Sequence, residues 1–478
     1  MKMKILSLFA LFVLSVSSFA QTYSILHNFG VTYRDGYAPL TVLVLNSNTL
    51  YGTTASGGTN GGGTIFKINT DGSGYGIIRS LTNSPVPEGG MVLMGNSLYG
   101  TMFTGGSANN GSIFKMNADG SGYTELHSFS ATVPSVFGTN SDGNRPQGDL
   151  ATDGSMLYGT AQYGGTNGNG TIFKINTDGM GFMVIKTFPA TFLGTNVIYG
   201  NPLVSGTNTD GARPIGGLVL DGSTLYGTTY HGGTSNGVVF AMQTDGSGYT
   251  VLKYFPSING IGTNSDGAAP VAGLTLNGDT LYGVTVGGGA GAVGNIFTLK
   301  TNGTAFASLH DFNYIIDGGW PHNALLLNGS TLYGTTAAGG ISNKGTIFMV
   351  STNGANFTIL RNFDAVSGSQ CDSKFVLSSN TLYGTAANGG TNGGGVVFGL
   401  AVLPQILMAN GNFGVQSNVF GFNLVGISNQ TAIVEASTNL TEPDWQPLQT
   451  NTLDGAPIYF YDPAWNLYPG RFYRLRLQ

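Results

Sequence analysis

The triplet Leu-Tyr-Gly recurs along this chain and constrains its fold more than any other feature. Its seven copies begin at Leu50, Leu98, Leu157, Leu225, Leu281, Leu332 and Leu382. Around each copy the same four apolar segments recur in the same order. In the fourth copy they are GGLVLDG (216–222), TLYGTTY (224–230), GVVFAMQTDG (237–246) and GYTVLKYF (248–255). A self-similar unit of about 50 to 70 residues is typical of repeat architectures, among which propeller blades contain four strands.

Each segment has the length of one β-strand. Tight glycine turns, DGS and TDGSG in the fourth copy, join the first segment to the second and the third to the fourth, which favours antiparallel hairpins. Glycine accounts for 78 of 478 residues and disfavours helix, while 41% hydrophobic residues are enough for a large core. Coils of a parallel β-helix are usually shorter and lack these hairpins. The sequence therefore predicts an all-β fold.

The two ends of the repeat array predict a closed ring. Residues 22–29, TYSILHNF, match the fourth segment of the repeat, although no other segment precedes them. The seventh copy ends with its third segment, VVFGLAV at 396–402, and lacks a fourth. We therefore predict a seven-bladed β-propeller over residues 21–402, with four antiparallel strands per blade and the N-terminal strand completing the last blade. A closed ring exposes no blade end and needs no capping repeat.

Fixed positions within the repeat indicate how each strand is used. The fourth strand of every copy carries one cation, at His27, Arg79, His127, Lys186, Lys253, His310 and Arg361. A row of cations suits an outermost edge strand, so we interpret the three histidines as rim residues and not as ligands. The first strand is expected to line the channel, where its small residues suit the crowding near the axis; these are Gly89-Gly90, Gly216-Gly217 and Ala272-Gly273. The tyrosines of the triplet are expected in the core or between blades.

The segment DGARPIGGLVLDGSTLYGTTYHGGTSNGVVFAMQTDGSGYTVLKYF (210–255) resembles the GloVer-type tandem repeat of exported bacterial proteins. Its elements D-G-x-x-P, L-Y-G-T-T, G-G-x-x-x-x-G and D-G-x-x-[YF] recur across about residues 22–402. The resemblance implies an exported repeat protein, often with a separate anchoring or sorting module, and it implies no catalytic residue. Two copies depart from the pattern, because copy two lacks the Asp-Gly and copy seven has Cys371 in place of proline.

The N-terminus predicts export. Lys2 and Lys4 precede an apolar run at 5–16, and Ser18-Phe19-Ala20 is a small-x-small cleavage site, so we interpret residues 1–20 as a signal peptide. We expect the mature chain in the extracellular space, at the cell surface or in the periplasm, with no integral membrane span. The single cysteine permits no intramolecular disulfide. A net charge of −5, with 9% charged residues and no basic block, argues against nucleic acid as a partner, and we expect a monomer.

In a propeller, the loops that enter the first strand share one face with the loops between the second and third strands. Long segments such as GTNSDGNRP (138–146) and glycine loops such as GGTNGGG (57–63) make this loop-rich face the candidate binding surface. Function is expected where residues break the repeat, in the first strand and in loops whose charged and aromatic groups suit glycan recognition. The candidate binding residues are Arg145, Asp149, Arg213, His231, Trp320, His322 and Lys374.

Two further motifs are interpreted as turn chemistry. The glycine loops lack the lysine and the following helix of a phosphate-binding loop, and NTDGSG (69–74) lacks the additional carboxylates of a calcium loop. For the aspartates of D-G-x-x-P we favour an Asx-turn before proline, and the alternative is a set of carboxylates that orders a cation or sugar hydroxyls. These are Asp35, Asp142, Asp210, Asp266 and Asp317. No catalytic triad or metal-spaced histidine cluster stands out, so we predict no metal and no cofactor.

After a linker at 403–412 the repeat stops. Residues 413–478 contain about five short predicted strands of a small β-sandwich-like domain, which resembles a module at the C-termini of exported proteins. Its expected role is sorting, attachment or packing. We interpret its aromatic residues as core, with a glycan-binding platform as the alternative; they are Trp445, Tyr459, Tyr461, Trp465 and Tyr473.

Together these features predict a non-catalytic, exported propeller that binds a glycan or a surface protein through its loop-rich face. One alternative is an enzyme that acts on extracellular polysaccharide, a lyase or a hydrolase, with a site at the channel mouth near Asp149, Lys374 and His322. The other is a purely structural surface protein.

Overall fold

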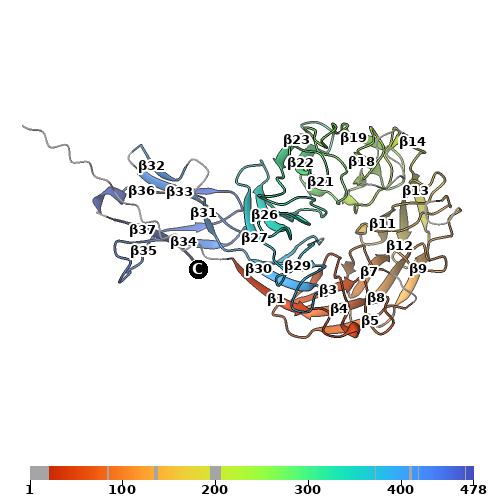
Figure 1. Ribbon diagram of the computed structural model, residues 1–478, viewed down its shortest axis with the longest axis horizontal. Helices are drawn as coiled ribbons and strands as arrows, with labels where there is room; N and C mark the ends of the chain where they lie inside the picture. The colour runs from red at the N-terminus through yellow and green to blue at the C-terminus, as the bar shows by residue number, and fades with distance from the viewer. Residues whose placement is uncertain are drawn as a thin grey trace, which may run out of the picture. The chain divides into compact units, whose positions relative to one another are not determined.

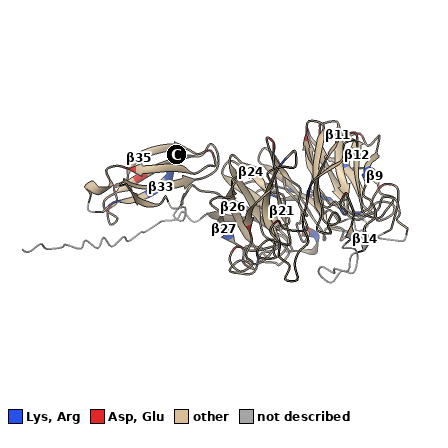
Figure 2. Ribbon diagram, turned by 90° about the horizontal axis from the view of Figure 1, so that it is seen from above, with Lys and Arg blue, Asp and Glu red and all other residues tan. Residues whose placement is uncertain are grey.

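The computed structural model describes residues 21–82, 86–133, 138–193, 206–371, 373–407, 412–417, 419–468 and 470–478, and the predicted signal peptide lies outside them. The chain divides into two compact units, Tyr23–Ala401 and Val402–Gln478, the second of which includes Gln21 and Thr22. Within the described ranges both units are built from strands and turns, with two short 3-10 helices, η1 (Tyr33–Asp35) and η2 (Trp465–Leu467), and no α-helix. No helix among these residues is long and apolar enough to cross a membrane. Charged residues, coloured blue and red, are sparse along the ribbon (Figure 2).

Seven four-stranded antiparallel sheets of the first unit share one strand order. The first sheet comprises β2 (Val44–Asn46), β3 (Thr49–Thr54), β4 (Thr64–Asn69) and β5 (Gly76–Ser80). The second comprises β6 (Val92–Met94), β7 (Ser97–Met102), β8 (Ser112–Asn117) and β9 (Thr124–Ser128). The third comprises β10 (Ala151–Thr152), β11 (Met156–Ala161), β12 (Thr171–Asn176) and β13 (Met183–Thr187). The fourth comprises β16 (Val219–Asp221), β17 (Thr224–Thr229), β18 (Val238–Gln243) and β19 (Thr250–Tyr254).

The fifth sheet comprises β20 (Thr275–Asn277), β21 (Thr280–Thr285), β22 (Asn295–Lys300) and β23 (Ala307–Asp311). The sixth comprises β24 (Leu326–Asn328), β25 (Thr331–Thr335), β26 (Thr346–Ser351) and β27 (Thr358–Asn362). The seventh comprises β28 (Val376–Ser378), β29 (Thr381–Ala386), β30 (Val396–Ala401) and β1 (Thr22–Asn28). A separate short pair, β14 (Phe192–Leu193) and β15 (Gly206–Thr207), lies in the connection between the third and fourth sheets.

The N-terminal strand completes the sheet of the last repeat. β1 lies beside β30, in the order β1-β30-β29-β28, and the Phe29 N–H donates to the Gly395 carbonyl at 2.9 Å. Figure 1 shows β1, in red, next to β30, in blue, while the sheets follow one another around a common centre. The first and last parts of the repeat array therefore meet in one sheet.

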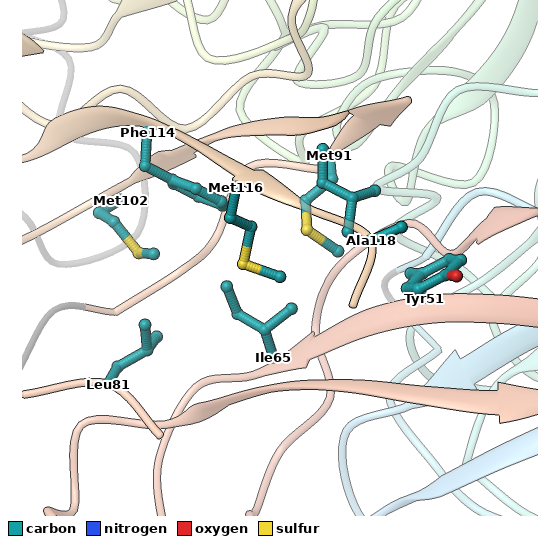
Figure 3. Packing of buried hydrophobic residues seen from close by; sticks show 9 residues of the cluster. Tyr51, Ile65, Leu81, Met91, Met102, Phe114, Met116 and Ala118 are labelled. Atoms are coloured by element: carbon teal, nitrogen blue, oxygen red, sulfur yellow. The ribbon is translucent and has the colours of Figure 1, made fainter. Parts of the chain in front are cut away.

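The Leu-Tyr-Gly triplet builds the contacts between sheets. Tyr51 packs into a core with Leu98, Phe114 and Met116 of the second sheet, as Figure 3 shows for Tyr51, Phe114 and Met116. The glycine of the triplet leaves room for the phenylalanine of the third strand, because a Cβ on Gly52 would lie 2.5 Å from Cζ of Phe66. The tyrosine thus joins neighbouring sheets and the glycine admits the ring that fills each sheet.

The cation of each fourth strand packs on an aromatic ring of the next sheet. Three histidine rings stack with centroids 3.6 Å from their partners: His27 on Tyr75, His127 on Phe182 and His310 on Phe357. The other four cations lie 3.7 to 4.1 Å over a ring: Arg79 over Tyr123, Lys186 over Tyr249, Lys253 over Phe306 and Arg361 over Tyr23. Because Tyr23 belongs to β1, the last contact joins the sixth sheet to the seventh through the N-terminal strand.

The aspartates of D-G-x-x-P face these cations. The pairs are His27–Asp35 at 3.1 Å, His127–Asp142 at 3.2 Å, His310–Asp317 at 2.9 Å, Lys186–Asp210 and Lys253–Asp266. In copies three to five, the turn contact that we favoured for the aspartates is made instead by an asparagine two residues earlier. Oδ1 of Asn140, Asn208 and Asn264 accepts the N–H of Gly143, Gly211 and Gly267 at 2.7 to 2.9 Å. The aspartate side chain is then free to pair with the rim. In the two copies without this aspartate the cation is an arginine stacked on a tyrosine.

The second unit contains two sheets that share one core. β33 (Val419–Val425) pairs with β31 (Gln405–Leu407), β32 (Gly414–Gln416) and β36 (Ile458–Asp462), and β34 (Thr431–Ser437) pairs with β35 (Gln446–Thr452) and β37 (Phe472–Leu477). Phe420, Phe422 and Phe460 of one sheet pack with Val434 and Leu475 of the other. β31 falls in the segment that we expected to be a linker, because its apolar residues pair with β33.

The aromatic residues of this unit divide between core and surface. Tyr473 stacks on Phe420, with centroids 4.9 Å apart, and Trp465 packs against the same core, as predicted. Trp445 is half-buried beneath Arg474, whose Cζ lies 4.4 Å from the ring centroid. Tyr459 and Tyr461 are exposed, so their assignment to the core was wrong. They occupy the outward positions of a strand whose inward position is Phe460.

Candidate functional site

The residue before proline in D-G-x-x-P occupies a special backbone position. Its φ is positive, between 53° and 57°, at Ala38, Arg145, Arg213, Ala269 and Trp320; the equivalent residue of copy seven, Gln370, precedes Cys371 instead of proline and has a φ of 54°. This conformation is disfavoured for residues with a Cβ. Two backbone hydrogen bonds hold it; for example, the Arg213 N–H donates to the Asn169 carbonyl at 2.8 Å and its carbonyl accepts the Tyr230 N–H at 3.0 Å. We call these six positions the pre-proline slots.

The residues directly after the proline line a central cavity of about 460 Å³. At the position after proline they are Leu40, Glu88, Gln147, Ile215, Val271 and His322. Two residues further on they include Val42, Asp149, Gly217, Gly273, Ala324 and Lys374. Gln162, Tyr230 and Val286, which follow the second strands, complete the wall with Gln370 from a slot. The cavity thus collects Asp149, His322 and Lys374 of the predicted site residues.

Asp149 is held against the channel wall. One carboxylate oxygen accepts the Gly90 N–H at 2.8 Å, and the carboxyl carbon lies 2.9 Å from where a Cβ on Gly90 would stand. Burial raises the pKa of Asp149 above its usual value, and the positive charge of Lys374 opposes that rise. The carboxyl group is enclosed by protein on most sides but still borders the cavity.

Glu88 is a second carboxyl group in the cavity, and it was missing from the predicted residues. Burial raises the pKa of Glu88, while the nearby charge of Arg145 lowers it. Copy two lacks the Asp-Gly that anchors the motif, so aligning the repeats on that pair leaves Glu88 without an equivalent. Aligning them on the proline places Glu88, after Pro87, at the position of His322.

The other predicted residues do not line the cavity. Arg145 Cζ lies 4.9 Å from the ring centroid of Phe103 and 5.8 Å from that of Tyr163. Arg213 is only 7% exposed, and its Cζ lies 5.1 Å from the Tyr163 centroid. Burial, followed by the charge of Arg213, lowers the pKa of His231 to about 4. The imidazole of His231 is therefore neutral at pH 7.

Trp320 occupies a pre-proline slot on the sixth repeat. It contacts Tyr314 with ring centroids 5.2 Å apart, and Ile315 and Ile316 next to that tyrosine are exposed. As for metals, no group of three or more His, Cys, Asp or Glu side chains in the described part of the chain is arranged to hold an ion.

The Gloeobacter/Verrucomicrobia repeat matches residues 10–200 and 261–439, which is more than half of the chain. The protein belongs to this GloVer repeat family. No curated protein matches its sequence. Among solved structures, an oligogalacturonate lyase from Vibrio parahaemolyticus superposes with a TM-score of 0.51 at 11% identity, covering 81% of this chain and 95% of that chain.

Two other solved structures are more distant in shape. A putative 6-phosphogluconolactonase from Bacteroides uniformis has a TM-score of 0.45 at 15% identity, with coverage of 87% and 98%, and TolB from Acinetobacter baumannii has 0.39 at 14%, with coverage of 64% and 62%. The likeness to the lyase, together with the four-stranded sheets, supports a propeller-like fold for this GloVer protein. At this identity it carries no statement about activity.

The cavity of the GloVer protein offers polar groups of both signs. Among the described lining residues there are two carboxyl groups, and each has a cation whose charge lowers its pKa, Lys374 for Asp149 and Arg145 for Glu88. The wall also contains amide side chains and apolar side chains. The amides are those of Gln147, Gln162, Asn323 and Gln370, and the apolar residues include Leu40, Ile215 and Val271. Such a wall suits a ligand that is neutral overall and rich in hydrogen-bonding groups.

Proposed function

We propose that this protein is an exported bacterial seven-bladed propeller that binds a carbohydrate in its central cavity and does not transform it. The closed ring is supported by contacts across its seam: Arg361 lies over Tyr23, and the Thr385 hydroxyl donates to the Thr41 carbonyl at 3.3 Å. Export rests on the N-terminal pattern of Lys2, Lys4 and the apolar run that follows. In this proposal the chain acts as a monomer.

The pairing of charges in the cavity carries the carbohydrate assignment. An anionic or cationic ligand would compete with the charges already compensating Asp149 and Glu88. A sugar adds no charge, and its vicinal hydroxyls donate to a carboxylate and accept from an ammonium or amide group at the same time. The aliphatic residues Leu40, Ile215 and Val271 supply surfaces for its C–H groups.

A glycan array with the full-length protein tests this proposal. Lys374→Ala is expected to weaken binding about tenfold or more, because a hydrogen bond to a charged group is lost and Asp149 is left without its cation. Lys300→Ala is the matched control, since Lys300 pairs with Asp279 at 2.6 Å and does not line the cavity. Trp320→Ala tests whether the surrounding loops also contribute to glycan binding. Absence of binding to any glycan, or equal binding by wild type and Lys374→Ala, contradicts the proposal.

The second candidate is hydrolysis or elimination of a polysaccharide at the same cavity. The observation in its favour is the pKa of Glu88, which burial raises above its usual value, because a raised pKa favours the protonated form that can donate a proton to a leaving group. Mass spectrometry of glycans incubated with wild type and with Glu88→Gln separates the two functions. Products that appear with wild type and vanish with Glu88→Gln establish the enzyme. Binding without products supports the binding protein. If there is neither binding nor product formation, a structural role is supported.

A further inference from the structure

The outward face of β36 in the second unit carries two large exposed rings. Side chains alternate along this strand, so Phe460, 2% exposed, points into the core while Tyr459 and Tyr461 are 41% and 56% exposed. Both tyrosines lie on the same face of the sheet, and two residues along a strand separate them by about 6.6 Å. Tyrosine rings exposed to this degree present about half of their surface to water, and covering their apolar part with a ligand is favourable.

Glycine makes room for one of these rings to lie along the sheet. A Cβ at Gly421, on the neighbouring strand β33, would stand 2.6 Å from Cζ of Tyr459 and closer still to its hydroxyl oxygen. The ring of Tyr459 therefore extends from β36 across the backbone of β33 and exposes a flat face. Any larger residue at position 421 would displace it.

A shallow open area continues from this ring. Tyr461, Gly421 and Gly414 are register partners across β36, β33 and β32. A Cβ at Gly414 would meet no atom of the described residues within 4 Å, so these residues leave the space above it open. The row of Tyr461 followed by two glycines, with Tyr459 lying over the middle strand, forms what we call the tyrosine platform.

The platform is uncharged. Its register partners Gly421, Asn423 and Gly414 carry no ionisable side chain. Nucleic acid needs cations for its phosphates, and none lies in these rows. A stable protein interface needs about 800 Å² on each partner, which is far more than two rings on one edge strand provide. A sugar polymer fits the observations, because its pyranose rings have flat C–H faces that stack on tyrosine while its hydroxyls reach the phenol groups.

We propose that the tyrosine platform is a second carbohydrate site, which binds a neutral polysaccharide by stacking on Tyr459 and Tyr461. It goes beyond the proposed function of the central cavity, because it uses other residues on the other unit of the chain. Loss of one site leaves the other intact, so the two proposals fail independently. Binding along an exposed strand, without a pocket, favours an internal stretch of a polymer over a chain end.

Native affinity electrophoresis of the full-length protein tests the platform. Gels contain hydroxyethyl cellulose, arabinoxylan or galactomannan, and retardation is compared with a gel without polysaccharide. Tyr459→Ala and Tyr461→Ala are each expected to weaken binding about tenfold, as loss of one aromatic contact of about 1.4 kcal/mol predicts, and the double variant is expected to lose more of the retardation than either single variant. Gly421→Val keeps both tyrosines but displaces the Tyr459 ring, and is expected to weaken binding as Tyr459→Ala does.

Two controls make the result specific. Tyr468→Ala removes a tyrosine of the same unit that is 43% exposed but outside the platform, and Lys300→Ala removes a cation that pairs with Asp279 outside both the platform and the cavity; both are expected to be retarded like wild type. The proposal is overturned if no gel retards the wild type, or if the double variant is retarded as strongly as wild type. A wild type that is not retarded but dimerises through these tyrosines in light scattering also overturns it, in favour of a second copy of the chain.

Discussion

Tyr23→Ala tests whether the N-terminal strand closes the ring of sheets. Tyr23 stacks on Phe398 of β30, with centroids 5.2 Å apart, and carries Arg361 of β27 4.0 Å above its ring. Truncation to alanine removes an aromatic pair worth about 0.5–1.5 kcal/mol and a cation–π contact worth about 0.5–1 kcal/mol. Adding the apolar surface of a half-buried ring, we expect the free energy of unfolding to fall by about 2–4 kcal/mol.

Tyr123→Ala provides the comparison, because Tyr123 holds the same repeat position inside the array. It stacks on Phe114 at 5.6 Å and carries Arg79 at 3.7 Å. Equilibrium unfolding in urea, analysed for both midpoint and slope, measures the two losses. If β1 closes the ring, the losses agree within about 1 kcal/mol. A loss below about 0.5 kcal/mol for Tyr23→Ala, beside one of about 2–4 kcal/mol for Tyr123→Ala, would refute the closure, because it would place β1 outside the cooperative fold.

Three further predictions concern stability. Gly227→Ala is expected to cost about 1–3 kcal/mol, because the new Cβ would meet a phenylalanine ring at 2.5 Å, whereas Gly76→Ala, in open space, should change urea stability by less than about 0.5 kcal/mol. Because the pKa of His231 is lowered to about 4, the free energy of unfolding falls as the pH drops from 6.5 towards 4. In urea titrations at pH 7 and 4.5, His231→Gln should reduce this fall by up to about 3 kcal/mol. Burial alone would raise the pKa of Asp210, but hydrogen bonding to Lys186 leaves that pKa lowered. The contribution of Asp210 to the free energy of unfolding is therefore present above pH 4 and lost in acid. Asp210→Asn should cost about 1 kcal/mol at pH 7 and reduce the loss of stability below pH 4.

All four strands of each repeat could be predicted from local sequence, but the extent of the first strand could not. In the fourth copy the predicted first segment spans 216–222, but β16 contains only Val219–Asp221. The reason is the packing at the axis, where a Cβ on Gly216 would stand 2.5 Å from the Ala272 carbonyl oxygen of the next repeat. Near the centre the chain must pass its neighbours too closely to form a regular ladder, and sequence periodicity does not record this.

Contacts between repeats were also beyond local reasoning. The row of cations was recognisable as a rim, but its partners were not, because each aspartate lies in the loop after the strand and the path by which that loop folds back is not written in its sequence. Asp142 was interpreted as part of a turn with its immediate neighbours in sequence. Its side chain instead contacts His127, which lies 15 residues earlier. Likewise, alternation along β36 predicts that Phe460 and its two tyrosine neighbours face opposite ways, but only the sheet shows which face is the core.

The pre-proline slots explain why residues at the mouth of the array vary while the fold persists. A left-handed backbone usually selects glycine, yet alanine, arginine, tryptophan and glutamine occupy the six slots with nearly the same φ. Their conformation is imposed by hydrogen bonds of the backbone alone, as at Trp320, whose N–H donates to Val293 at 2.9 Å and whose carbonyl accepts from Ala337 at 3.2 Å. Since no side chain takes part in these bonds, the fold tolerates different residue types at these positions. Selection on ligand recognition can therefore act on the slots, and on the cavity positions just after them, without rebuilding the sheets.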